Sequence, residues 1–219
     1  MKQSLSLTLI ISLVTLGTFI LLEPQLTKGE TADTTVSLTV EDEITLVCSS
    51  TAALAPNIAA VSGGTATSTF LCTIVTTDGD GYNLNIRKSQ KLQIADLEYS
   101  RFNDYATTTT YSDWTYDTPP NGSSTFAFCV NDAASTTDIA LTFLDNGADE
   151  CGTSTSVTSW HCWHPIPTDA SYIEVANRNA STTGSGVTIE FGLQAVAGGE
   201  NNLTSGNYYT TTTVTAVAN

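Results

Sequence analysis

After residue 30 the chain is built from short segments in which apolar and polar residues alternate, and this pattern restricts the fold most. No apolar stretch there keeps a helical period for more than two turns, and clusters of Gly, Asn, Asp and Pro separate the segments. Thr supplies 39 of the 219 residues, and its branched side chain fits a pleated strand better than a helix. The patterns predict strands at residues 35–40, 44–49, 67–76, 82–88, 124–130, 138–143, 157–162, 172–176, 187–195 and 208–217.

Ten short strands without crossover helices predict an all-β fold, an antiparallel two-sheet β-sandwich over residues 33–219. We expect Asp78-Gly-Asp-Gly81 to form a tight reversal between two strands, because Gly adopts positive φ values easily. Residues 89–123 fit the pattern least. They are expected to make an excursion from one end of the sandwich, with Pro119-Pro120 stopping its last strand.

The first 30 residues form a segment of a different kind. Met1-Lys2 gives a positive start, and residues 5–22 then run without a charge. Such a run is typical of a secretory signal peptide or of a single membrane-anchor helix, and its length fits both. Either reading places the domain outside the cell, attached to a membrane only through residues 5–22 if they are not cleaved.

The charge of the chain limits its partners. Past residue 30 it holds five basic residues against 20 acidic ones. Such a domain repels phosphate backbones, so nucleic acid is excluded as a partner. Asn-x-Ser/Thr triplets begin at Asn121, Asn179 and Asn202. In an exported chain they could accept glycans, although chance triplets are expected in a Thr-rich sequence.

Five cysteines in an exported chain predict disulfides and one remaining thiol. Cys48 and Cys72 each lie on the apolar face of a predicted strand, which makes them the first choice for a disulfide. Cys151 and Cys162 would close a short loop as the second pair, but the sequence leaves Cys129 open as an alternative partner.

Three motifs, in order along the chain, carry a resemblance. They are TTVSLTV at residues 34–40, VTTDGDGYNLNI at 75–86 and SGNYYTTTTVTAVA at 205–218. This layout is similar to that of secreted all-β surface proteins and pilin-like fibre subunits of bacteria. The resemblance implies a structural or adhesive role at the cell surface and no catalytic residues. The favoured function is therefore a non-enzymatic fibre subunit that assembles into a homopolymer.

The N-terminal strand suggests how copies could join. Val36, Leu38 and Val40 share one face of an extended segment that precedes the charged break at residues 41–43. Such a segment can add to an open sheet edge of another copy, where its alternate side chains fill pockets. Pairing within its own subunit is the alternative.

An aromatic-rich stretch supports a second function. Tyr111, Trp114 and Tyr116 lie among Thr and Asp residues, and exposed aromatic faces stack on sugar rings. The chain could therefore be a carbohydrate-binding or adhesive module. The other interpretation is an aromatic cluster that covers an open end of the sandwich.

SWHCWH contains both histidines of the chain. On a strand, Trp160, Cys162 and His164 would lie on one face and His161 and Trp163 on the other, so the histidines could not share a metal. Two histidines this close leave few ways to build a catalytic triad, and the chain has no nucleophile-elbow motif. We expect a core Trp, an exposed His and a disulfide here, and no enzyme activity.

Two acidic loops are candidate calcium ligands, the one cofactor considered. They contain Asp78 and Asp80, and Asp145 and Asp149. Calcium prefers several oxygen ligands from flexible loops. Ordinary Asx-turns explain the same residues equally well.

Overall fold

The structure is a computed structural model that describes residues 37–39, 41–95, 97, 99–105, 124–145, 151–152, 162–168, 171–182, 184–198 and 203–219. The chain divides into two compact units, Met1–Val40 and Glu41–Asn219. All strands described below lie in the second unit. Within the described residues, no helix has the length and apolarity needed to cross a bilayer, and residues 5–22 lie outside that part.

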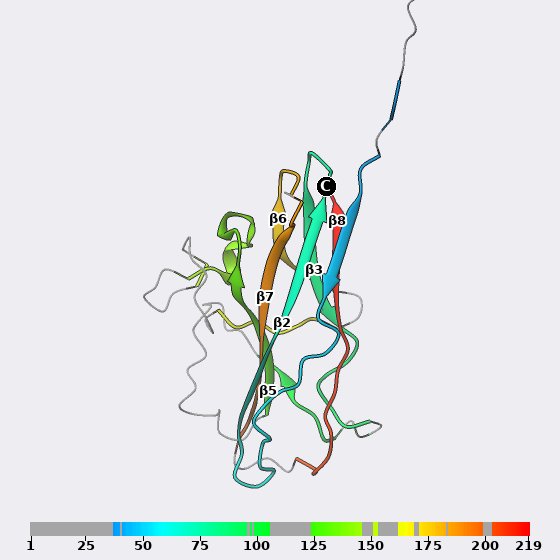
Figure 1. Cartoon of the computed structure of the whole chain (residues 1–219). Coiled ribbons are helices and arrows are strands. Elements are labelled where there is room, and N and C mark those ends of the chain that lie inside the picture. The colour runs from blue at the N-terminus through cyan, green and yellow to red at the C-terminus, as the bar shows by residue number, and fades with distance from the viewer. Residues whose placement is uncertain are drawn as a thin grey trace, which may run out of the picture. The chain divides into compact units, whose positions relative to one another are not determined.

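The described regular structure consists of strands and two single-turn 3₁₀ helices (Figure 1). The elements are β1 (Ile44–Cys48), β2 (Gly64–Thr76), β3 (Tyr82–Lys88), β4 (Asn103–Asp104), β5 (Thr125–Ala133), η1 (Thr136–Asp138), η2 (Leu141–Phe143), β6 (Ile173–Arg178), β7 (Val187–Ala197) and β8 (Thr212–Ala218). The prediction of an all-β domain is confirmed for the described residues.

The strands form two sheets. One has the order β1-β2-β7-β5-β4, and the other has the order β6-β3-β8. Every pairing is antiparallel except that of β4 with β5, which is parallel. The long central pair is β2 with β7, in register from Gly64 opposite Ala197 to Ile74 opposite Val187.

The core lies between the sheets because their strands alternate. In β3, Tyr82, Leu84 and Ile86 are buried while the residues between them are partly exposed. Tyr82, Leu84 and Ile86 belong to the same hydrophobic cluster as the inward-facing residues of β2, β5 and β7. Phe70 of β2 stacks on Phe191 of β7 with ring centroids 4.8 Å apart, a geometry that adds to simple area burial.

One stretch differs from its prediction. Residues 138–143 were expected to be a strand, but they form parts of η1 and η2. Ile139 pairs with Ala176 only as an isolated bridge. The turns bury Ile139 and Phe143 and leave Leu141 64% exposed, whereas a strand would have placed all three on one face.

Three further predictions concern residues that are mostly outside the described part. The predicted strand at 157–162 is described only at Cys162, and that at 35–40 only at residues 37–39, which have no regular structure. The excursion at 89–123 is described as far as residue 105. This part contributes Leu92 and Phe102 to the core.

The turn at 78–81 forms between two strands, β2 and β3, as predicted. Gly81 N–H donates to the Asp78 carbonyl at 3.2 Å. Since β2 and β3 belong to different sheets, the turn carries the chain from one sheet to the other instead of closing a hairpin. Gly81 has φ +86°, and a Cβ there would lie 1.9 Å from the Arg178 carbonyl oxygen.

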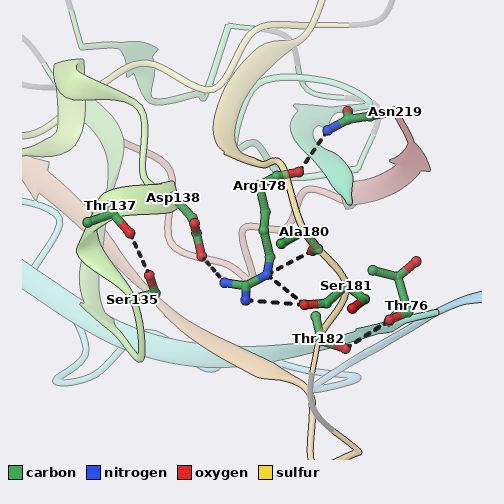
Figure 2. A network of polar contacts seen from close by, with 9 residues as sticks. All are labelled: Thr76, Ser135, Thr137, Asp138, Arg178, Ala180, Ser181, Thr182 and Asn219. Atoms are coloured by element: carbon green, nitrogen blue, oxygen red, sulfur yellow. Dashed lines mark hydrogen bonds and ion pairs between the residues drawn. The ribbon is translucent and has the colours of Figure 1, made fainter. Parts of the chain in front are cut away.

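A polar network around Arg178 joins η1, the β6–β7 connection and the C-terminal Asn219 (Figure 2). Arg178 Nη1 donates to Asp138 Oδ2 at 2.7 Å, and its Nε donates to the Ala180 carbonyl at 3.0 Å. The Asn219 side chain donates to the Arg178 carbonyl at 2.8 Å. The start of β3, the end of β8 and the end of β6 are therefore held together at one corner of the domain.

Candidate functional site

The candidate site lies beside two sheet edges. β1 ends the order of the five-stranded sheet and β8 ends that of the three-stranded sheet. The two strands lie next to each other (Figure 1), yet no ladder joins them. Each therefore keeps one edge without a strand partner among the described residues. A free edge presents backbone N–H and C=O groups that can pair with an added strand.

The core is incompletely covered beside these edges. Ile44 and Leu46 of β1, and Val214 and Ala216 of β8, pack against the core but remain partly exposed. Residues 191–197 of β7, by contrast, are buried at every position. Apolar surface left in contact with water is a source of binding free energy.

A groove of about 1070 Å³ opens here. Core side chains form its apolar floor, among them Phe70, Phe102, Phe126 and Leu193. Its walls come from the chain between β1 and β2 at residues 49–58 and from the approach to β8 at residues 203–213. Its volume is slightly above the range of about 300–1,000 Å³ that is usual for sites that hold small ligands.

Hydrogen bonds fix both walls. On one side, Ser49 N–H donates to the Leu71 carbonyl at 2.9 Å, and Leu71 N–H donates to Ser49 Oγ at 3.2 Å. On the other, the Tyr208 hydroxyl donates to the Thr204 carbonyl at 2.8 Å, and the Tyr208 ring meets Phe102 edge-on at 5.3 Å. The groove is thus pre-formed, which lowers the ordering cost of binding.

The groove has no charged lining residue in the described part of the chain, although the protein carries a formal net charge of −15. Ser, Thr and Asn side chains make up its polar rim. Tyrosines are its only titratable side chains among those residues. This chemistry suits an uncharged occupant with both apolar and hydroxyl side chains.

Both disulfides join the pairs expected first from the sequence. Cys48 bonds Cys72 across the β1–β2 register, and Cys151 bonds Cys162. Cys129 is buried and belongs to neither bridge. Two disulfides are typical of chains that fold in an oxidising compartment such as the cell exterior.

The SWHCWH stretch is described from Cys162 onward, and it is not a regular strand there. Cys162 has φ +56°, a left-handed conformation that interrupts alternation. Trp163 packs on Ala127 and Cys129 on the outer face of β5. His164 forms an isolated bridge to Phe128 and points with it to the inner face, so Trp163 and His164 lie on opposite faces as predicted.

His164 is 3% exposed, so it is not the exposed histidine expected in this stretch. Its ring lies 4.7 Å from that of Phe143. Nε2 lies 3.0 Å from the Thr142 carbonyl, so this nitrogen carries the proton and donates. Burial lowers the pKa of His164, opposed by the hydrogen bond to Thr142. His161 and Trp160 lie outside the described residues.

The acidic candidates are only partly described. Asp78 Oδ1 accepts from Asp80 N–H at 2.8 Å, which is the geometry of an Asx-turn. Asp145 is buried and forms an isolated bridge to Cys151, and Asp149 lies outside the described residues. Among the residues with described positions, no group of three or more His, Cys, Asp or Glu could hold a metal ion.

Other predicted site residues also fall outside the described part, namely Tyr111, Trp114, Tyr116, Val36 and Val40, together with the glycan candidates Asn121 and Asn202. Leu38 is described and is 86% exposed. Asn179 is exposed in the β6–β7 connection.

Sequence reasoning missed two features. The first is the groove, because it forms between strands that are distant in sequence. The second is an ion pair between the buried Lys88 and the partly exposed Asp104. Its signal was present, since Lys88 continues the inward alternation of Tyr82, Leu84 and Ile86.

Comparison with known proteins identifies no family and no relative. A scan against protein-family models finds no match, and searches of curated proteins and of solved structures find none either.

Proposed function

We propose that this chain is a non-enzymatic subunit of an extracellular fibre, in which residues 34–40 of one copy occupy the groove beside β1 and β8 of the next. The observation that carries the proposal is an uncharged groove, open to the core, beside the ends of β1 and β8, two edge strands that each lack a second strand partner among the described residues. The fold would then be a pilin-like or Ig-like sandwich, preceded by a signal peptide or anchor helix. The disulfides support an extracellular location.

The proposed occupant matches the groove in chemistry. Residues 34–40 read TTVSLTV and carry no charge. Val36, Leu38 and Val40 would face the apolar floor, while Thr35, Ser37 and Thr39 would face the polar rim or solvent. Main-chain hydrogen bonds to an edge strand would add affinity, and the alternate side chains would fix the register.

Burial of the apolar face of this segment favours assembly. Burying three apolar side chains contributes on the order of 5 kcal/mol before ordering costs. The backbone ladder adds a smaller net term and slows dissociation. The exposure of Leu38 in the subunit leaves this free energy available to a contact with another copy.

The test compares two neighbouring substitutions in the exported chain, Leu38→Asp and Thr39→Asp. Both introduce the same charge on an exposed residue, but only Leu38 shares the face of Val36 and Val40. Leu38→Asp should raise the critical concentration for filaments, measured by sedimentation and electron microscopy, about tenfold to a hundredfold. Thr39→Asp should change it far less.

A second pair of variants tests the groove. Ala52→Trp places a large ring at a half-buried lining position, and Ala59→Trp places the same ring at an exposed position outside the lining. Only the first should block assembly. Equal critical concentrations within either pair, or filaments of unchanged length after deletion of residues 31–40, would contradict the proposal.

Pairing of the segment within its own subunit gives a different result. In that case Leu38→Asp lowers the free energy of unfolding of the monomer, whereas strand exchange leaves it unchanged. The carbohydrate-binding alternative stays a prediction, since Tyr111, Trp114 and Tyr116 lie outside the described residues.

A further inference from the structure

Lys88 is an amine enclosed in the core. It is the last residue of β3, and its side chain is 0% exposed. The strand alternation that buries Tyr82, Leu84 and Ile86 also directs Lys88 inward. Lysine is almost never fully buried without a partner, because removing its charge from water is costly.

The partner of this amine is the carboxylate of Asp104. Lys88 Nζ is in direct contact with Asp104 Oδ1. The ring of Phe126 lies beside the same amine, with Nζ 5.8 Å from the ring centroid. The carboxylate side chain is 34% exposed, so the reacting groups meet at the boundary between the core and solvent.

Both backbones are held in place around this contact. Lys88 N–H donates to the Pro167 carbonyl at 2.9 Å, and Lys88 lies opposite Thr212 of β8. Asp104 lies opposite Phe126 in the β4–β5 pairing, and the adjacent Tyr105 N–H donates to the Phe126 carbonyl at 3.1 Å. Two groups fixed in contact by a folded scaffold react with effective concentrations far above those in solution.

The surroundings also favour the reactive form of the amine. Burial lowers the pKa of Lys88, opposed by the hydrogen bond and the charge of Asp104 and reinforced by the charge of Lys91. Transfer of one proton from the ammonium to the carboxylate converts a poorly solvated ion pair into a neutral amine and a neutral carboxylic acid. An amine is a nucleophile only in this neutral form.

We propose that Lys88 and Asp104 condense into an intramolecular amide. After the proton transfer, the lone pair of Nζ attacks Cγ of Asp104 and forms the N–C bond. The C–OH bond then breaks, and the hydroxyl leaves as water with the second proton of the amine. The ammonium and carboxylate thus become one amide and one water, with no oxidant, reductant or further reactant.

The amide joins the two sheets covalently. Lys88 belongs to the β6-β3-β8 sheet and Asp104 to the edge strand β4 of the other. The link would fix a two-residue strand whose described ladder consists only of its parallel pairing with β5. The amide forms within one chain, so its formation does not depend on fibre assembly.

Intact-mass spectrometry of the purified, folded and then reduced protein tests the proposal. The wild-type chain should be lighter than its sequence by the mass of one water. Lys88→Met and Asp104→Ala should each have the full mass of their sequences. Asp104→Asn can condense by releasing ammonia, and its product should then have the same mass as the wild-type product.

Lys91→Met serves as the matched control, because Lys91 lies close by, contacts Asn103 and is not fully buried. It removes only the smallest influence on the pKa of Lys88 and leaves both reacting groups in place, so it should keep the loss of water. Peptide mapping should show one branched peptide that joins Lys88 to Asp104 in the wild type and in this control. Near-ultraviolet circular dichroism verifies that the variants are folded.

Two outcomes would overturn the inference. A wild-type chain with the full mass of its sequence means that Lys88 and Asp104 form only a buried ion pair. Loss of water that persists in Lys88→Met means that the dehydration is elsewhere, for example a succinimide at Asp78-Gly79 or Asp80-Gly81.

Discussion

Replacement of Gly81 by Ala should damage the fold far more than the same change two residues earlier. A Cβ at position 81 would lie 1.9 Å from the Arg178 carbonyl oxygen and 2.7 Å from the Ala180 nitrogen. Both contacts are with backbone and cannot be relieved by rotating a side chain. At Gly79, nothing lies within 4 Å of the added atom, so Gly79→Ala is a control within the same turn.

The expected cost has two parts. Holding Ala at the φ of +86° found at Gly81 costs about 1–2 kcal/mol. The Arg178 carbonyl must also move, and it accepts the hydrogen bond from the Asn219 side chain at 2.8 Å (Figure 2). Asn219 N–H also donates to the Gly81 carbonyl at 3.3 Å. Two hydrogen bonds contribute about 1 kcal/mol each, so the total is about 3–4 kcal/mol.

Guanidinium unfolding of the oxidised protein, followed by tryptophan fluorescence, measures this difference. Gly81→Ala should lower the free energy of unfolding by about 3–4 kcal/mol, with an unchanged m-value. Gly79→Ala should remain within about 1 kcal/mol of the wild type, because it also restricts the unfolded chain. Free energies for the two variants that agree within about 1 kcal/mol would refute the reasoning from backbone contact.

Two further predictions concern buried titratable groups. Among the described residues, no group forms a hydrogen bond with the buried Tyr82 hydroxyl, so Tyr82→Phe should keep or raise the free energy of unfolding, by up to about 1 kcal/mol. Burial raises the pKa of Tyr82 from 10.0 to about 12. Stability from the neutral phenol is therefore present below pH 10 and lost as the pH rises towards 12. Denaturation between these pH values should show a smaller decline for Tyr82→Phe, and equal declines would contradict the assignment. Burial lowers the pKa of His164 below 6.5, so its contribution is present above pH 6.5 and lost as the pH falls. Denaturation at falling pH should give the wild type an additional slope of up to about 1.4 kcal/mol per pH unit. His164→Gln, which can still donate to the Thr142 carbonyl, should lack that slope, and equal slopes would refute the prediction.

The sequence predicts elements whose signal is local. β3 matches its predicted range of residues 82–88 because apolar residues alternate along its whole length. The Cys48–Cys72 bridge follows from the same alternation in two neighbouring strands. The stretch at 138–143 misled the prediction, because a period of two cannot distinguish a strand from two short turns that bury Ile139 and Phe143.

Features that depend on distant residues were not predictable. The grouping of β3 with β6 and β8 places the 78–81 turn between sheets, and nothing in the turn specifies that choice. The groove arises from edges more than a hundred residues apart. Lys88 could be identified as an inward lysine, but Asp104 lies on a strand of two residues that has no periodic signal.

The Cys48–Cys72 bridge determines how tension would pass through the domain. A pull applied at residue 41 could peel β1 from β2 only as far as Cys48, where the last registered pair is also covalently joined. Beyond that point the load enters β2 at Cys72, in the strand with the long register to β7. Residues 49–71 are bypassed, so the wall of the groove at 49–58 carries no load and keeps its shape while the chain is stretched.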